Sequence, residues 1–380
     1  MTAVPHYFDH NATTPVSPEV LQAMAPVWTE AFGNASSIHS YGQQARTLLG
    51  RARRQIAEML RTLCEEIVFT SGGTEADNTA LFGAGGNSEG HVITTTIEHP
   101  AVLQACATLP SVTFVPVDSK GVVGPDAIRK AIRPDTRLIS VMHVNNELGV
   151  IQPIEEIARI AREAGILFHC DGVQAPGKLT LDLGPLGPDL YSISAHKIYG
   201  PKGVGALFVR KGAGLRPLLH GGPHERKMRA GTENVAGAVG FGRAAQSVVE
   251  EGVAESARLE NLRDRLEKNI LDRVRGAHIN GAGAPRVSNS SNIRFDGIDS
   301  EPLLIALDLK GFAVSSGSAC SSGATEPSHV LAAIGLSKEQ ARSSIRVSLG
   351  RGNTLEQVDA LAEAVCQCVA RLRKLAPAYA

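Results

Sequence analysis

Five short apolar segments of the chain each run into polar residues whose side chains could do chemistry. Apolar runs of this length between helical patterns are typical of strands buried on both faces. In open α/β sheets, ligands bind at the carboxyl ends of the strands, so these polar residues are expected to meet at one edge. The polar stretches are Thr70-Ser-Gly-Gly-Thr-Glu75, Glu98-His99, Asn145-Asn-Glu147, His169-Cys-Asp-Gly-Val-Gln174 and Ser194-Ala-His-Lys197.

The first of these stretches could bind a phosphate group. Gly72 and Gly73 allow backbone N–H groups to approach an anion closely, and the helix that starts beside Thr74 adds a favourable dipole. The spacing matches neither the dinucleotide-binding glycine motif nor the nucleoside-triphosphate loop. The alternative is an ordinary turn with a Ser or Thr helix cap.

Lys197 and Asp171 predict a cofactor with an aldehyde and a basic ring. A lysine held in a cleft can lose its proton and form a Schiff base with a carbonyl group. Lys202 is the competing lysine, but it lies in a Gly-Pro turn, so we assign it to the surface. Asp171 could pair with a protonated ring nitrogen, and His99 could stack on the ring and carry protons. Together with the phosphate site, these residues describe a pyridoxal phosphate centre.

A second chemical signal, far along the chain, is a thiol among small residues. Cys320 lies within the eleven small residues of segment 315–325, none of which can anchor a hydrophobic core. A cysteine on an exposed loop is a candidate nucleophile. The remaining cysteines lie in apolar contexts and are interpreted as structural: Cys64, Cys106, Cys170, Cys366 and Cys368.

Arg346 is a lone cation within an apolar segment, and its planar fork would suit a substrate carboxylate. The alternative is a surface arginine. We expect no metal centre. His220 and His224 have no third ligand in sight, and Cys366 and Cys368 point to different faces of a helix.

The elements that position these residues alternate between strand and helix. This order predicts an α/β protein with a largely parallel sheet, and the helices are expected at 74–82, 100–107, 125–132 and 154–164. The expected strands are 66–70, 91–96, 113–117, 137–144, 166–171, 189–195 and 205–209.

A long, charged helical pattern from Glu233 to Val274 is expected to link two domains. After it come a strand near 287–295, a helix near 301–309, short strands near 312–315 and 345–349, and a final helix over 354–375. We therefore predict a large domain over 14–255. Residues 1–13 and 256–380 are expected to form a smaller α/β domain that carries Cys320.

Composition excludes several classes of protein. The chain has 380 residues, with Lys plus Arg and Asp plus Glu both 38, so the formal net charge is zero. A nucleic-acid binder usually shows a basic excess, and no apolar run is long enough for a membrane span. The sequence starts without a signal segment and has few cysteines, so we expect a cytoplasmic protein that binds neither nucleic acid nor membrane.

The chain resembles the cysteine desulfurases of the NifS/IscS-like class, the group of the class-V aminotransferase family that has a long cysteine loop. The similarity runs nearly end to end. It is carried by Tyr7-Phe-Asp-His-Asn-Ala-Thr-Thr-Pro15, Phe32-Gly-Asn-Ala-Ser-Ser37, Phe69 to Glu75, Glu98-His99, His143-Val-Asn-Asn-Glu147, Asp171 to Gln174, Ser194 to Gly203, Arg229-Ala-Gly-Thr-Glu-Asn234, Ser315 to Cys320, Glu326-Pro-Ser-His329 and Ser343-Ser-Ile-Arg346.

This resemblance implies a fold-type I transferase that depends on pyridoxal 5'-phosphate and has a mainly parallel seven-stranded sheet. Lys197 would bind the cofactor covalently, Asp171 would pair with the ring nitrogen, and His99 would stack above the ring. Gln174 and Asn146 would contact the ring hydroxyl, and Asn34, Asn146 and Arg346 would hold the substrate carboxylate. The phosphate would be held by Gly73, Thr74, Ser194 and His196, with the partner subunit's Thr232 reaching in.

Three positions depart from the family pattern. Ala195 stands where glycine is usual before the His-Lys pair, and Gly172 stands where alanine, serine or threonine is common. Ala35 replaces the frequent proline after Asn34. These departures concern local geometry and leave the implied chemistry intact.

The implied reaction converts L-cysteine to L-alanine. Lys197 would remove the Cα proton, and the Cys320 thiolate would attack the substrate sulfur and keep it as a persulfide. A homodimer would then pass the sulfur to acceptor proteins such as an iron–sulfur scaffold, with Cys320 contacting the acceptor or a transferred cluster.

Two rival functions remain open at this stage. An aminotransferase or selenocysteine lyase of the same fold would use the lysine without Cys320. A non-catalytic scaffold that kept the fold would have a broken site, yet every expected position is occupied.

Overall fold

A computed structural model of the chain describes residues 6–84, 89–316 and 327–375, and its centre is a seven-stranded sheet. The strand order is β2-β8-β7-β6-β5-β3-β4. Only β8 runs antiparallel to its neighbours within this sheet, so the predicted fold class is confirmed. The strands are β2 (Ile67–Thr70), β3 (His91–Thr95), β4 (Val112–Val115), β5 (Thr136–Ser140), β6 (Leu167–Asp171), β7 (Leu190–Ser194) and β8 (Gly205–Val209).

Helices cover both faces of this sheet, which is why its strands are apolar throughout. Val68 and Leu207 face a cluster with α3 (Gly73–Gly83) and α4 (Pro100–Ala107). Phe69 and Phe208 point to the opposite face, since side chains alternate along a strand. That face packs against α2 (Ser40–Leu60), α6 (Ile154–Glu163) and the first half of α8 (Val235–Leu271). Two shorter helices, α5 (Pro125–Ala131) and α7 (Leu183–Leu186), complete this part.

A smaller part of the molecule combines both ends of the chain. Its three-stranded antiparallel sheet has the order β12-β10-β9, and β1 (His6–Tyr7) pairs in parallel with β11 (Phe312–Ala313). Phe8 packs in a separate apolar cluster with residues from α8, α9 and α12. The other elements are β9 (Ala277–Ile279), α9 (Ser300–Asp308), β10 (Ser290–Phe295), α10 (His329–Ala333), α11 (Lys338–Arg342), β12 (Ser344–Ser348) and α12 (Leu355–Leu375).

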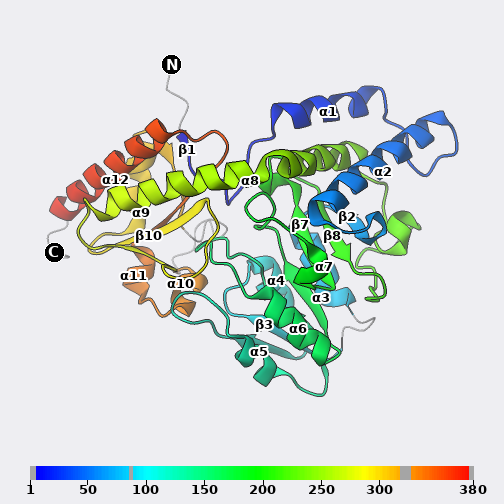
Figure 1. Cartoon of the computed structure of the whole chain (residues 1–380), viewed down its shortest axis with the longest axis horizontal. Coiled ribbons are helices and arrows are strands. Elements are labelled where there is room, and N and C mark those ends of the chain that lie inside the picture. The colour runs from blue at the N-terminus through cyan, green and yellow to red at the C-terminus, as the bar shows by residue number, and fades with distance from the viewer. Residues whose placement is uncertain (1–5, 85–88, 317–326, 376–380) are drawn as a thin grey trace.

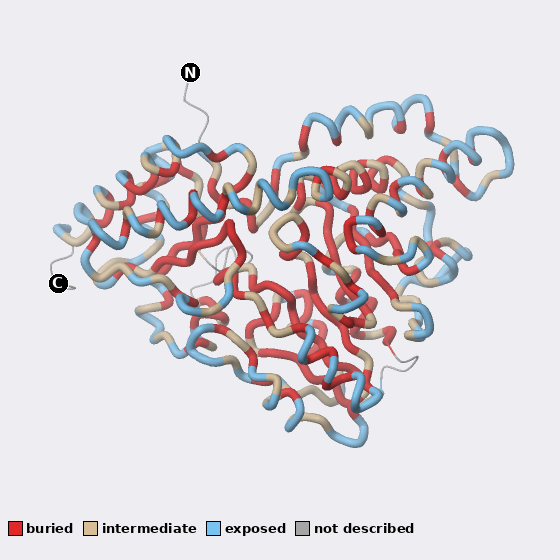
Figure 2. The backbone as a smooth tube through the Cα atoms, viewed as in Figure 1, coloured by how far each residue is buried: buried red, intermediate tan, exposed pale blue. Residues whose placement is uncertain are grey.

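Helix α8 runs through both parts (Figure 1). Phe241 and Ala245 belong to the core beside the large sheet, whereas Leu259, Leu266 and Ile270 belong to the cluster of the smaller part. Figure 2 shows the buried interior on both sides of the exposed middle of this helix. Among the described residues, no helix has both the length and the apolar character needed to cross a bilayer.

The sequence predictions placed every strand of the large sheet within a few residues. The strand expected to reach Val144 ends at Ser140, although the N–H of His143 still donates to the carbonyl of Asp171, at the end of β6. The helices α1 (Pro18–Thr29) and α2 were not predicted. Five alanine, leucine and isoleucine residues of α2, which are buried, nevertheless recur at helical spacing: Ala45, Leu49, Ala52, Ile56 and Leu60.

Candidate active site

A cavity of about 290 Å³ lies at the carboxyl ends of β6 and β7, where the large sheet meets the smaller part. Most of the predicted site residues line it: Gly73, Thr74, His99, Asn146, Asp171, Gln174, Ser194, His196, Lys197 and Arg346. Asn34 and Thr232 are exposed and do not line it. Cys320 lies outside the described residues.

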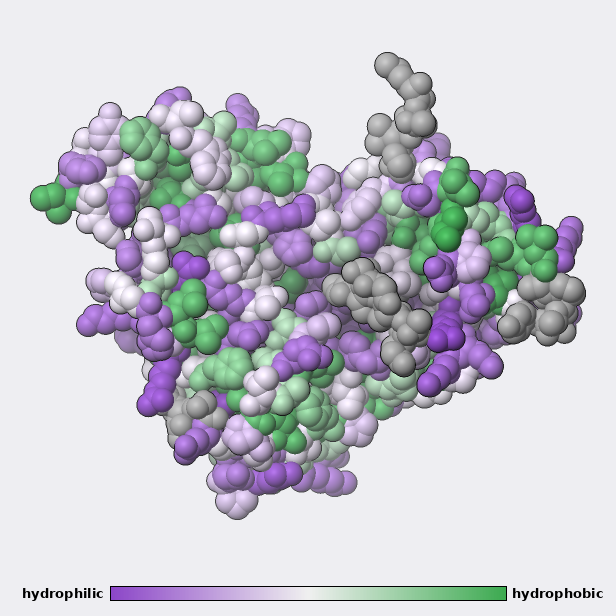
Figure 3. Space-filling model, turned by 180° about the vertical axis from the view of Figure 1, so that it is seen from behind, coloured by the Kyte–Doolittle hydropathy of each residue, from purple (hydrophilic) through white to green (hydrophobic). Residues whose placement is uncertain are grey.

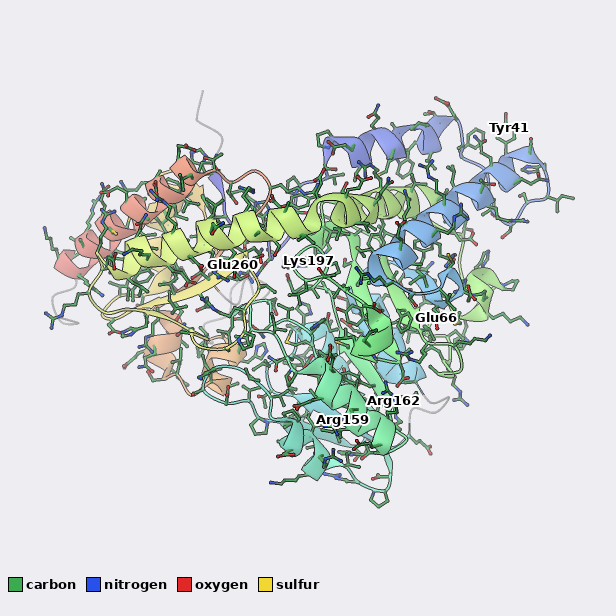
Figure 4. The ribbon with its side chains drawn as sticks, in the orientation of Figure 1. Tyr41, Glu66, Arg159, Arg162, Lys197 and Glu260 are labelled. Atoms are coloured by element: carbon green, nitrogen blue, oxygen red, sulfur yellow. The ribbon has the colours of Figure 1, made fainter. Side chains whose placement is uncertain are left out.

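Lys197 enters the cavity from the short turn that follows β7. Its Nζ donates to the backbone carbonyls of Asn11, at 2.6 Å, and Ala12, at 2.7 Å. Figure 4 shows Lys197 in the middle of the molecule, beneath α8. Two carbonyl oxygens therefore hold the amine inside the cavity.

Asp171 ends β6 and lies almost completely buried beside the same cavity. Its Oδ1 accepts a hydrogen bond from the Val173 N–H at 3.0 Å. Burial raises the pKa of this carboxyl group, and the nearby His99 and Lys197 act in the opposite direction. A cationic ring nitrogen would therefore be a strongly favourable partner for this carboxylate.

His99 is held in one orientation by the start of α4. It occupies the N-cap position, where its Nδ1 accepts from the Ala101 N–H at 3.1 Å. An imidazole that accepts at Nδ1 carries its proton at Nε2. Burial lowers the pKa of His99, so the neutral ring is favoured.

The end of the cavity beside Gly73 and Thr74, at the N-terminus of α3, suits an anion. Gly72 precedes the N-terminus of α3 at φ 158°, and a Cβ atom on Gly73 would lie only 2.7 Å from Val173 Cγ2. Glu75, in the first turn of α3, would oppose an anion, but its carboxylate forms an ion pair with Arg229 at 2.9 Å. Free N–H groups at a helix N-terminus bind phosphate well.

Arg346 closes the side of the cavity that faces the smaller part. It lies in β12 with only 2% of its surface exposed, and it pairs with Asp9 at 2.6 Å. One of its terminal nitrogens donates to the Asn146 carbonyl at 3.1 Å. Its buried Nε has no hydrogen-bond partner among the described residues, which suits an incoming carboxylate.

Asn11 connects these groups, and the sequence analysis did not single it out. Its carbonyl accepts from Lys197 and from Gln174, and its amide nitrogen donates to the Asn146 carbonyl. Its backbone N–H donates to Ser348 Oγ. The available signal was its place inside the motif Phe8-Asp-His-Asn-Ala12. Asp77 and Lys178 were also missed, because Asp77 pairs with His169 and Lys178 bonds to Asn11, both far away along the chain.

The described residues fit pyridoxal 5'-phosphate. A lysine amine for the aldehyde, a buried carboxylate for the ring nitrogen and a glycine-walled anion site share one cavity. Arg346 and its unpartnered Nε lie at another side of the cavity, where a substrate carboxylate could bind.

Comparisons with known proteins agree with this geometry. Residues 6–361 match the family model described as aminotransferase class-V. A cysteine desulfurase IscS of Methanosarcina thermophila is 48% identical over 98% of this chain and 93% of its own length. The corresponding protein of Dictyoglomus turgidum is 46% identical over 98% of this chain and 96% of its own length.

A solved structure titled NifS-like protein superposes with a TM-score of 0.90 at 38% identity, covering 97% of this chain and all of the other. The relatives and the fold therefore agree, and the chain belongs to the cysteine desulfurases of the class-V aminotransferase family.

Proposed function

We propose that the protein is a cysteine desulfurase, which uses pyridoxal 5'-phosphate to convert L-cysteine to L-alanine and retains the sulfur as a persulfide on Cys320. The observation that carries this proposal is the shared cavity of Lys197, Asp171 and Arg346. A relative with 48% identity that bears the same activity in its name supports the substrate.

Each end of the cavity has a role in binding the cofactor. Asp171 would pair with the ring nitrogen, Gln174 and Asn146 would contact the ring hydroxyl, and His99 would contact the ring face. When bound, the cofactor supplies an electron sink for negative charge at the substrate Cα. Gly73, Thr74, Ser194, His196 and the partner subunit's Thr232 would hold its phosphate.

The chain's own groups bind the substrate and move protons. Arg346 and Asn146 hold the carboxylate and so point the Cα–H bond at Lys197, and the partner subunit's Asn34 completes this site in the homodimer. The Lys197 amine takes the proton from Cα. The Cys320 thiolate then forms a bond to the substrate sulfur. The carbon–sulfur bond breaks, its electron pair stays with carbon, and protonation there leads to alanine.

Residues on both sides of the segment that carries Cys320 are anchored beside the cavity. Ser315 exchanges backbone hydrogen bonds with Arg346, at 3.1 and 2.6 Å. On the other side, Ser328 Oγ donates to Glu147 Oε2 at 2.6 Å, and His329 Nε2 donates to the Glu98 carbonyl at 2.9 Å. These anchors support a thiol that serves this cavity.

We further propose that two copies of the chain associate through the α1–α2 end. Trp28 is 65% exposed and Ile38 is 88% exposed, and Phe32 and Tyr41 lie between or beside them. Figure 3 shows apolar surface at this end of the molecule. A homodimer would cover it and would bring Asn34 and Thr232 toward the partner's cavity.

The proposed cellular role is sulfur donation in the cytoplasm to acceptor proteins such as an iron–sulfur scaffold. A reducing compartment keeps thiols available for persulfide chemistry. Relatives named cysteine desulfurase IscS support this role.

The Cys320→Ala variant tests the central claim. It should keep the visible absorbance of the bound cofactor and the change in that absorbance on adding cysteine, because Lys197 and Asp171 are untouched. Steady-state sulfide release should fall by a factor on the order of 100 or more. After exposure to cysteine, peptide mass spectrometry should find one extra sulfur on Cys320 in the unmodified protein.

Cys366→Ala is the matched control, because this thiol lies on α12, and it should keep full activity. Undiminished sulfide release by Cys320→Ala would refute the persulfide route and favour a lyase that does not need this thiol.

A further inference from the structure

A second lysine, Lys178, lies directly behind the cavity that holds Lys197. It follows Gly177 in the loop after β6 and borders a small cavity of about 40 Å³ that Lys197 also lines. Its Nζ lies 3.0 Å from Asn11 Oδ1 and 2.5 Å from Gln174 Oε1. No step of the proposed reaction uses Lys178, yet it contacts two residues that surround the reacting groups.

These contacts fix which way the Gln174 amide points. Nζ donates its N–H groups, so the atom of Gln174 that faces it must be the oxygen. The amide nitrogen is thereby turned toward the Asn11 carbonyl, 2.9 Å away. Of its two N–H groups, one is used there and one remains for a group in the main cavity.

Lys178 also fixes the orientation of the Asn11 side chain. Its Oδ1 accepts from Lys178 and, at 3.1 Å, from Asn289. Its backbone carbonyl accepts from both Gln174 and Lys197. A chain of hydrogen bonds therefore runs from Lys178 through Gln174 and Asn11 to the Lys197 amine.

The surroundings of Lys178 make this arrangement costly to replace. Burial lowers its pKa, and the charges of Lys197 and Arg346 lower it further. The other charged or titratable residues that line the small cavity, besides Lys197, are His10, Tyr199, Glu255 and Arg351. An amine in such a place is retained only if its hydrogen bonds are made, and removing it would leave two buried oxygens with fewer donors.

We propose that Lys178 is a positioning residue for cofactor binding: it orients Gln174 and Asn11, and through them the ring-hydroxyl side of the cofactor and the Lys197 amine. This inference rests on the proposed function, because it takes Gln174 as a contact of the cofactor.

The test is a double-mutant cycle on cofactor affinity. The dissociation constant for pyridoxal 5'-phosphate is measured for the full chain and for Lys178→Met, Gln174→Met and the double variant. Loss of hydrogen bonds to a buried amine should weaken binding about tenfold in Lys178→Met. Because Lys178 acts through Gln174, the double variant should be only slightly weaker than Gln174→Met alone.

Lys178→Gln provides a second route if the methionine variant does not fold, since its amide can still donate a hydrogen bond. We expect it to bind the cofactor several-fold more tightly than Lys178→Met and more weakly than the unmodified protein. Lys130→Met, on the exposed side of α5, is the matched control and should bind normally.

A folded Lys178→Met or Lys178→Gln variant with unchanged affinity would overturn the inference. So would strictly additive effects in the cycle. Failure of the proposed function can be told apart from failure of this inference. It would appear as normal cofactor binding without sulfur release from cysteine, whereas the mutant cycle measures only cofactor affinity.

Discussion

Three buried carboxylates influence one another at the base of the active site. Burial raises the pKa of Asp77, Glu98 and Asp171. Neighbouring carboxylates raise the pKa of Asp77 and Glu98 further, whereas His99 and Lys197 lower that of Asp171. Like charges this close cannot all ionise cheaply. Of the three, Asp171 is the carboxyl group whose pKa is lowered by the charges of His99 and Lys197, so negative charge is favoured there over Asp77 and Glu98.

Glu98 should make stability depend on pH. Its pKa rises from 4.5 to about 8 in the folded chain, mainly through burial. The folded state then holds a proton that the unfolded state has already released, so stability is full below about pH 4.5 and falls as pH rises through 8. Between pH 6 and 8 the free energy of unfolding should fall by on the order of 2 kcal/mol from this group.

Glu98→Gln should flatten that decline when urea unfolding is followed at the two pH values. A glutamine oxygen can accept the bonds that Thr95 and Met142 now donate to Oε1, and its neutral amide resembles the protonated acid. An equally steep decline in the variant would show that another group titrates in this range.

At the residue scale, the sequence located the groups that end strands. Lys197, Asp171 and His99 each follow an apolar run, so their shared edge could be predicted. Lys178 and Asn11 follow no such rule. Lys178 bonds to Gln174, four residues earlier, but also to Asn11, 167 positions away, and the bond from Lys197 to Asn11 spans 186 positions, so no local pattern contains the whole network.

At the scale of elements, β6 and β7 explain one departure from the family pattern. A Cβ on Gly172 would lie 2.0 Å from the ring of Tyr191, which is fully buried in β7. The Tyr191 hydroxyl bonds to His143 Nδ1 at 2.7 Å, so the ring cannot turn aside without losing that bond. Glycine is required at this position because tyrosine occupies the space of a side chain.

Gly172→Ala should therefore destabilise this chain by about 3 kcal/mol through overpacking. The double variant Gly172→Ala, Tyr191→Leu should lose less than the sum of the two single changes. Gly352→Ala, where nothing lies within 4 Å of the added Cβ, is the control in denaturant unfolding. Additive losses would show that the two positions do not compete for space.

The longest helices that the sequence analysis missed, α1 and α2, lie at the N-terminal end, while the short elements α7, β9, α10 and α11 were missed farther along the chain. Helix α2 is amphipathic but rich in arginine and glutamine, and it precedes the first strand of the large sheet. An alternation of strands and helices therefore gives no hint of it. Its apolar stripe finds a partner only once the first half of α8, about 200 residues later, has folded against it.

At the scale of the molecule, we propose that the domains divide at the middle of α8, with 14–255 on one side and 1–13 plus 256–380 on the other. The separate apolar clusters support this boundary. A further cluster, in which Met142 and Leu148 pack against Val330 and Leu331, crosses it near the site.

Because α8 is continuous, destabilising one part of the molecule should also make the other part unfold more easily. Leu266→Ala, at a fully buried position, should lower the free energy of unfolding by about 2–5 kcal/mol. Hydrogen exchange measured by mass spectrometry should then accelerate around Phe241 as well as around Leu266. Leu271→Ala, at a 43% exposed position of the same helix, should change little. Faster exchange confined to residues beyond 256 would show that the parts unfold independently.

The use of both chain ends in one site also bears on protein synthesis. Asn11 leaves the ribosome more than 300 residues before Arg346 and Ser348, and the hydroxyl of Ser348 accepts a hydrogen bond from the backbone N–H of Asn11. The large sheet can form while the chain is still growing, since N-terminal units fold first. The catalytic pocket, by contrast, can close only after Arg346 and Ser348 have left the exit tunnel, so a product truncated before them retains the sheet and lacks a working centre.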